Sequence, residues 1–189
     1  MGLLKEGGES VVYTAQCHSP LGEILLAAKD DALIGLWFSG QKYFLGSLKE
    51  PMTEQKDHSV LRKAQHWLDR YFAGEKPEGS ELKIAPVGSE FRKAVWEVLC
   101  EIPYGELTTY GEIAQKVALK LGKKSMSAQA VGGAVGHNAV SIMIPCHRVV
   151  GANGSLTGYA GGIDKKIQLL VHEGVNVGRL FVPRRSTAP

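Results

Sequence analysis

Cys146 is the side chain of this sequence best suited to nucleophilic chemistry. It follows a short apolar run, 142–144, that is typical of a strand, and it stands between Pro145 and His147. A free thiol has a pKa of about 8.5 and is mostly protonated at neutral pH, so it needs a base or a positive neighbour to become a thiolate. Successive side chains of a strand point to opposite faces. We therefore expect His147 to assist Cys146 only if the chain turns here or a water bridges them.

The residues after this cysteine predict a hairpin, a loop and a helix. The Asn-Gly pair at 153–154 is a strong two-residue turn signal between the apolar residues 149–150 and Leu156. The glycine-rich segment 158–162 exposes its backbone and is suited to line a pocket. A helix is expected over 164–172.

Glu173 follows that helix and is a candidate to orient His147. A Cys–His–acid relay is an established way to activate a thiol. Arg148 adds positive charge nearby. The residues alone leave a structural cysteine and a catalytic one as equal alternatives.

The other two cysteines do not indicate a disulfide framework or a metal site. Three cysteines without regular spacing do not form a disulfide pattern, and the chain has no CxxC or HxxxH pair. Cys17 and His18 would need distant partners to bind a metal. Cys100 falls near the apolar side of a predicted helix, so we expect it in the core. We expect no metal and no cofactor.

The second half of the chain predicts three consecutive helices. Ser89 is expected to cap the first, which ends before Pro103. Thr109 and Glu112 have the spacing of a capping box for the second. Ser127 is expected to cap the third, over 128–136. Two short helices joined by a loop behind another helix form a helix-turn-helix pattern.

The third of these helices has features that suit contact with nucleic acid. Gly132, Gly133 and Gly136 each weaken a helix by about 1 kcal/mol relative to Ala, which is reasonable where another molecule approaches the backbone closely. Lys123 and Lys124 lie just before the helix, and its N-terminus offers free N–H groups to phosphates. A purely structural helical corner is the alternative.

Charge and hydropathy agree with a DNA-binding second half. Residues 1–88 carry 10 basic and 12 acidic side chains, whereas residues 89–189 carry 12 basic and 7 acidic ones. If a polyanion binds, the second half is where it would bind, and ordinary surface charge for solubility is the equal alternative. No apolar run approaches the roughly 18 residues of a membrane span, and the first residues lack the layout of a secretory signal. We expect a cytoplasmic protein that does not contact a membrane.

The first half predicts a small α+β unit. Apolar and β-branched runs separated by turn residues indicate antiparallel strands at 11–17, 23–29 and 32–38, and residues 82–84 suggest a last strand. Apolar residues at helical spacing predict a helix over 59–72. Segment 39–56 is polar and ambiguous.

Four segments together resemble one known family. They are IPYGELTTYGEIA, SAQAVGGAVGHN, IPCHRVVGANGSLTGYAGG and LLVHEGV, in that order. Their order and spacing are similar to those of the O6-alkylguanine-DNA alkyltransferases, over about residues 89–177. The resemblance implies an α/β (α+β) fold, with a ribonuclease-H-like domain and small antiparallel sheet at 1–87. A winged-helix or helix-turn-helix domain would follow at 88–189, its last eight or so residues forming a flexible tail.

The resemblance also implies the activity. The protein would bind double-stranded DNA through the minor groove as a monomer and flip out O6-alkylguanine, and also O4-alkylthymine. It would then move the alkyl group irreversibly to a cysteine, because the target atom cannot be reached in the stacked duplex. The implied catalytic residues are Cys146 as acceptor, His147 as base, Glu173 as its partner and Asn138 as a brace of the turn.

The resemblance assigns substrate and DNA contacts as well. Tyr110 would crowd the DNA backbone and donate to the guanine ring, the Val149 carbonyl would accept from the exocyclic amine, Tyr159 would form a pocket wall, and the Ala160 N–H would meet O6. The implied DNA contacts are Lys123, Lys124, Ser127, Ala128, Gln129, Gly132 and Gly133.

Several positions depart from the family pattern. Gln129 stands where an arginine often enters the base stack, so salt dependence and lesion preference are expected to differ. Ala139 and Ser141 replace usual prolines, which predicts a looser pocket rim or room for larger alkyl groups. Ala160 replaces a frequent serine, and the zinc-binding residues of some relatives have no clear counterpart. Two rival functions are a DNA-binding module without alkyl transfer and a thiol hydrolase.

Overall fold

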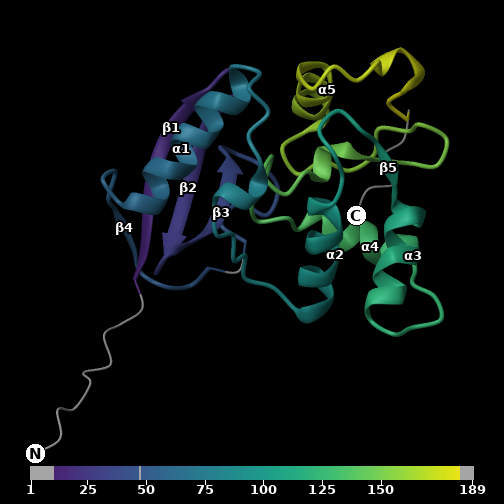
Figure 1. The fold of residues 1–189 in the computed structure, drawn as a ribbon, viewed down its shortest axis with the longest axis horizontal. Helices are drawn as coiled ribbons and strands as arrows, with labels where there is room; N and C mark the ends of the chain where they lie inside the picture. The colour runs from purple at the N-terminus through teal and green to yellow at the C-terminus, as the bar shows by residue number, and fades with distance from the viewer. Residues whose placement is uncertain (1–10, 47, 184–189) are drawn as a thin grey trace, which may run out of the picture.

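The computed structural model describes residues 11–46 and 48–183, which form a small sheet with one helix and a mainly helical second part (Figure 1). The predicted C-terminal tail lies mostly outside these residues. None of the helices within these ranges is long and apolar enough to cross a membrane.

The sheet of the first part has the strand order β3-β2-β1-β4. Strands β1 (Val12–Ser19), β2 (Gly22–Lys29) and β3 (Ala32–Phe38) are antiparallel, as predicted. The ambiguous polar segment contributes β4 (Met52–Glu54), which pairs parallel with β1 and makes the sheet mixed. Helix α1 (Ser59–Phe72) matches its predicted bounds and packs its apolar face on the sheet (Figure 1).

The outer edge of β3 connects the two parts of the chain. The prediction of a strand over 82–84 is wrong, because Ile84 forms only an isolated parallel bridge with Leu33. Beside it, Leu36 donates its N–H to the Ala139 carbonyl (2.8 Å) and accepts from the Ser141 N–H (2.9 Å). A proline at position 141 would have no N–H to donate. The segment that contains Ala139 and Ser141, expected to be looser without its prolines, is therefore held to β3 by a hydrogen bond that a proline at position 141 could not form.

Three helices of the second part pack together. They are α2 (Glu90–Cys100), α3 (Tyr110–Lys120) and α4 (Ala128–Gly136). All three predicted caps are present: Ser89 and Ser127 accept backbone N–H groups, and Thr109 forms the capping box with Glu112. The Trp96 indole on α2 donates to the Ala134 carbonyl on α4 (2.9 Å), which fixes these two helices against each other.

Two predictions are wrong: the core position of Cys100 and the hairpin at the Asn-Gly turn. Cys100 is exposed rather than in the core, because it lies on the last turn of α2, away from the packed face. The Asn-Gly turn forms, with Gly154 at φ +82°, but no hairpin follows it. Instead β6 (Val149–Val150) pairs parallel with β5 (Thr108–Thr109). The tertiary fold therefore pairs β6 with the distant strand β5 and not with the neighbouring segment after the turn.

Helix α5 (Ile163–His172) completes the fold, and short 3-10 helices lie at Gly79–Glu81, Cys146–Arg148 and Val177–Arg179. The main hydrophobic cluster is continuous across both parts: it includes Leu36 of β3, Trp67 of α1, Val95 of α2 and Leu169 of α5. Because burying apolar surface is the main stabilising contribution in folding, the two parts stabilise each other.

Candidate active site

The chain turns at Cys146, as assistance by His147 requires. Residues Cys146–Arg148 form a 3-10 helix, and the apolar run before them is a turn rather than the predicted strand. Ile142 in that turn has φ +69°, a left-handed conformation that is costly for a β-branched residue. The turn directs successive side chains of the Pro-Cys-His-Arg segment differently from a strand.

Asn138 braces this turn with its side-chain amide. Its Nδ2 donates to the Ile144 carbonyl (2.7 Å) and to the sulfur of Cys146 (3.0 Å), and its Oδ1 accepts from the Val140 N–H (3.0 Å). Asn138 is buried, so each of these bonds is shielded from water. The amide therefore holds the start and the end of the turn together and contacts the thiol directly.

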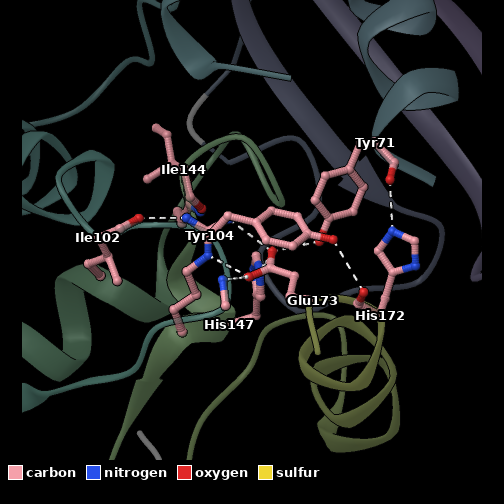
Figure 2. A network of polar contacts seen from close by, with 10 residues as sticks. Tyr71, Ile102, Tyr104, Ile144, His147, His172 and Glu173 are labelled. Atoms are coloured by element: carbon pink, nitrogen blue, oxygen red, sulfur yellow. Dashed lines mark hydrogen bonds and ion pairs between the residues drawn. The ribbon is translucent and has the colours of Figure 1, made fainter. Parts of the chain in front are cut away.

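His147 is fully buried and uses one ring nitrogen. Its Nε2 lies 2.7 Å from Oε1 of Glu173 (Figure 2). An ionised carboxylate can only accept, so Nε2 carries the proton of the neutral ring. The other nitrogen, Nδ1, is buried without a hydrogen-bond partner among the described residues. Nδ1 is therefore the nitrogen available to take a proton.

Glu173 is the centre of the polar network in Figure 2. Its two oxygens accept from five donors, which are His147 Nε2, Arg148 Nε and Nη2, the Tyr71 hydroxyl and the Gly105 N–H. Hydrogen bonds from His147 and Arg148 hold the pKa of Glu173 far below its usual range against the opposing effect of burial. The carboxylate is therefore charged at every physiological pH.

Burial keeps the thiol and the imidazole in their neutral forms. Desolvation raises the pKa of Cys146, which is only 4% exposed, although the Asn138 hydrogen bond and the charge of Lys166 oppose this. Desolvation also lowers the pKa of His147, with the Glu173 hydrogen bond opposing it. The resting site therefore holds a protonated thiol beside a neutral base rather than a preformed ion pair.

Two of the predicted substrate-contact residues, Tyr110 and Tyr159, have hydroxyl groups close enough to interact with the same thiol. Tyr159 is buried, and desolvation, together with the nearby thiol, raises the pKa of its hydroxyl, which has no hydrogen-bond partner among the described residues. The Tyr110 hydroxyl donates to the Thr157 carbonyl (3.0 Å). The Ala160 carbonyl accepts from the Lys42 N–H (2.9 Å), which ties the glycine-rich loop to the first part.

Two charged groups of this site were not assigned from the sequence. Lys166 is fully buried and donates to the carbonyls of Val149 (2.5 Å) and Thr157 (3.0 Å). Arg148, expected only as nearby charge, forms the ion pair with Glu173 and also donates to the Ile102 carbonyl. The sequence signal for Lys166 is weak, because a lysine in an amphipathic helix normally faces solvent.

Five of the predicted DNA-contact residues are exposed, and Gly132 and Gly133 are half-buried. Lys123, Lys124, Ala128 and Gln129 are exposed, as is the capping Ser127. The groove between α3 and the start of α4 has a volume of about 380 Å³ and includes both lysines. A Cβ at Gly133 would meet nothing within 4 Å, and one at Gly132 would make only ordinary contact with Tyr110. Packing within the protein therefore does not require glycine at these positions.

Among the described residues, no group of three or more His, Cys, Asp or Glu side chains could hold a metal ion. The polar groups of the site are instead arranged around the cysteine. The architecture and the site together define a two-part α/β protein with a buried cysteine beside a His–Glu pair.

Comparison with known proteins shows the family. Residues 12–86 match the 6-O-methylguanine DNA methyltransferase ribonuclease-like domain, and residues 90–175 match the DNA binding domain of the same family. The chain belongs to the 6-O-methylguanine DNA methyltransferase family.

Individual relatives match over most of their length. A methylated-DNA–protein-cysteine methyltransferase of Methanosarcina acetivorans is 43% identical, over 86% of this chain and 99% of the relative. The protein of the same name from Haemophilus influenzae is 35% identical over 88% of both chains. The crystal structure of Mycobacterium tuberculosis OGT in complex with DNA has a TM-score of 0.75 at 37% identity, covering 89% of this chain and 94% of that one.

Proposed function

We propose that this protein repairs DNA by moving the alkyl group of O6-alkylguanine irreversibly to the sulfur of Cys146. The observation that carries the proposal is the turn that contains Cys146 and the buried His147, which pairs with Glu173 and whose Nδ1 has no hydrogen-bond partner among the described residues. Curated relatives carry the name of this activity, and one structural neighbour is a complex with DNA.

The proposed reaction is a displacement at carbon. The thiol proton passes to Nδ1 of His147 through a bridging water, and the sulfur attacks the alkyl carbon. The S–C bond forms as the C–O6 bond breaks, and guanine leaves with the bonding electrons. The Tyr110 hydroxyl donates to the departing ring, which lowers the barrier. For this step it must leave the Thr157 carbonyl that it contacts here.

The product explains why each molecule acts once. A thioether on Cys146 has no readily displaced group and no acyl carbon that water could attack. Glu173 contacts the histidine and Asn138 contacts the thiol, so they position these two groups, and no bond to either residue forms or breaks in the reaction. The protein is thus consumed in proportion to the lesions repaired.

DNA binding is assigned to the basic second part. The lesion must leave the base stack to reach a thiol that is 4% exposed. We assign the start of α4 to the minor groove, with Gln129 occupying the space of the flipped nucleotide. Lys123 and Lys124 are placed at phosphates, so binding weakens as salt rises.

The remaining features of the proposal follow the same assignment. The division into functional units falls near residue 88, and α3 with α4 acts as the helix-turn-helix. Repair of O4-alkylthymine, binding as a monomer and a cytoplasmic location are part of the proposal. Val149 and Ala160 contribute backbone groups to the base. The Val149 carbonyl already accepts from Lys166, so it has one remaining lone pair for the exocyclic amine.

Intact-mass measurement tests the transfer. After incubation with a duplex containing O6-methylguanine, the protein is expected to gain the mass of one methyl group, and Cys146→Ala is expected to gain none. Cys100→Ser is the matched control, because that thiol is exposed and makes none of the hydrogen bonds of the relay described above, and it should gain one methyl group like the wild type. An unchanged wild-type mass with retained DNA binding would support a binding module instead.

A further inference from the structure

Tyr71 brings a hydroxyl from the first part of the chain into the relay of the second. It lies near the end of α1, is 1% exposed and donates a hydrogen bond of 2.7 Å to Oε1 of Glu173, 102 residues away in the sequence (Figure 2). The same oxygen receives Nε2 of His147, also at 2.7 Å. Arg148 Nη2 also donates to this oxygen (2.9 Å), so Tyr71, His147 and Arg148 share one carboxylate oxygen.

The position of the Tyr71 ring is well determined. The ring stacks on Trp67 with centroids 5.4 Å apart and meets Tyr104 edge-on at 6.0 Å. The backbone carbonyl of Tyr71 lies 2.7 Å from the His172 ring, at the end of α5. These contacts fix the ring independently of its hydroxyl, so the hydroxyl can be removed while the ring stays in place.

Several charged and titratable groups surround the His147–Glu173 pair. They are Tyr71 of α1, Tyr104 after α2, Cys146 and Arg148 of the turn, Tyr159 of the glycine-rich loop and Lys166 of α5. Arg148 neutralises the carboxylate as an ion pair, and Gly105 donates to its other oxygen. Tyr71 is the neutral donor in this set that shares an oxygen with His147.

We propose that Tyr71 is a positioning residue of the transfer site. Its hydroxyl, by donating a hydrogen bond to Glu173, weakens the electrostatic attraction of this carboxylate for protonated His147. The inference rests on the function proposed above. A donor on Oε1 stabilises the carboxylate and reduces its attraction for an imidazolium ion. A residue from the first part of the chain thus adds to the effect of burial and favours the neutral form of the base.

Tyr71→Phe tests this directly. Without the hydroxyl, Oε1 holds more negative charge toward His147, so the pKa of His147 rises from its lowered value, by about half a unit or more. Transfer needs the neutral base, so the acid limb of the single-turnover rate against pH moves to higher pH by the same amount. Histidine NMR titration of the free protein measures the same shift without DNA.

Tyr104→Phe is the matched control. It also loses one phenolic hydroxyl, but that hydroxyl donates to the His172 carbonyl and does not contact Glu173. We expect its acid limb and its His147 titration to coincide with the wild type. A purely structural role of Tyr71 would lower the rate by one factor at every pH, and an unshifted limb and titration in Tyr71→Phe overturn the proposal.

A second variant covers the case in which Tyr71→Phe does not fold. Fluorotyrosine at position 71 keeps the shape and makes the hydroxyl a stronger donor, so the pKa of His147 should fall further; no change or a rise contradicts the proposal. The two levels remain separable. A wild-type protein that accepts no alkyl group refutes the transfer function, while the NMR titration still decides whether Tyr71 tunes His147.

Discussion

Lys166 donates a hydrogen bond of 2.5 Å to the carbonyl oxygen of Val149, three residues beyond Cys146. The ammonium group has a second acceptor at Thr157, and the side chain is fully buried. Lys166 therefore joins the turn that contains Cys146 to the segment that leads to Tyr159. Burial lowers the pKa of Lys166 to about 8, and the nearby thiol opposes this effect.

The first prediction concerns this lysine and stability. Between pH 8 and about 10.4 the folded protein releases the Lys166 proton while the unfolded chain keeps it. Because the unfolded state binds more protons there, the lysine's contribution to the free energy of unfolding rises with pH, by up to about 3 kcal/mol. Urea unfolding at both ends of this pH range should show that the free energy of unfolding of the wild type increases with pH relative to that of Lys166→Met. For Lys165→Met, at the partly exposed neighbouring position, the difference in free energy of unfolding from the wild type should stay constant over the same pH range.

The second prediction concerns Glu173→Gln. The substitution leaves Arg148 and His147 without a carboxylate, so transfer is expected to slow by roughly a hundredfold while affinity for duplex DNA stays near wild type. Rapid-quench kinetics and fluorescence anisotropy measure the two quantities. Glu101→Gln, which removes an exposed ion pair with Lys116, should affect neither. Equal transfer rates would exclude the relay.

The third prediction follows from the depressed pKa of the same carboxylate. The native state holds Glu173 ionised, so its stabilising contribution is present above the pKa of the unfolded chain, about 4.3, and is lost as the pH falls below it. At neutral pH, breaking this buried pair is expected to cost about 3–5 kcal/mol. The stability gap between wild type and Glu173→Gln should therefore narrow on acidification; a constant gap would contradict the assignment.

The fourth prediction concerns thiol reactivity in the native protein. Cys100 is exposed, whereas Cys17 and Cys146 are buried, so a short maleimide pulse should add one label at Cys100. Burial raises the pKa of Cys17 to about 11, and desolvation also raises the pKa of Cys100, so exposure and not the pKa distinguishes the two thiols. Mass spectrometry counts the labels, and Cys100→Ser should receive none. Rapid labelling of that variant at Cys146, distinguished from Cys17 by peptide mapping, would mean that Cys146 is accessible without DNA.

The fifth prediction concerns Gln129, which is exposed on the first turn of α4. If its side chain fills the space of the flipped nucleotide, Gln129→Ala should weaken flipping roughly tenfold and plain duplex binding much less. A fluorescent base analogue beside the lesion reports flipping. Lys124→Ala should instead weaken binding to all duplexes and reduce the salt slope by about 1. An unchanged fluorescence signal in Gln129→Ala would refute the role.

Local elements of this fold could be predicted from the sequence. Ser89, Thr109 and Ser127 cap their helices as expected, because a cap joins a side chain to a backbone N–H three residues away. The helix over 59–72 has the predicted bounds, since its apolar spacing determines one buried face.

Pairings over long distances in the sequence could not be predicted in this way. The segment at 149–150 carried a clear hairpin signal, yet it pairs with residues 108–109. Cys100 has the composition of a core position, but the packing of α2 leaves it exposed. In each case the deciding neighbour is distant in the sequence, and local propensity contains no information about it.

The sequence by itself determined the helix ends, the capping groups and the chemical identities of the thiol, the imidazole and the carboxylate, because these depend on residue type and short spacing. Only the tertiary structure decided which groups meet. It placed Tyr71 and Arg148 on Glu173, left Nδ1 of His147 without a partner in the described part of the chain and buried Lys166 beside the cysteine turn. Burial and long-range contact set the protonation state of this site, and both arise only when the whole chain packs.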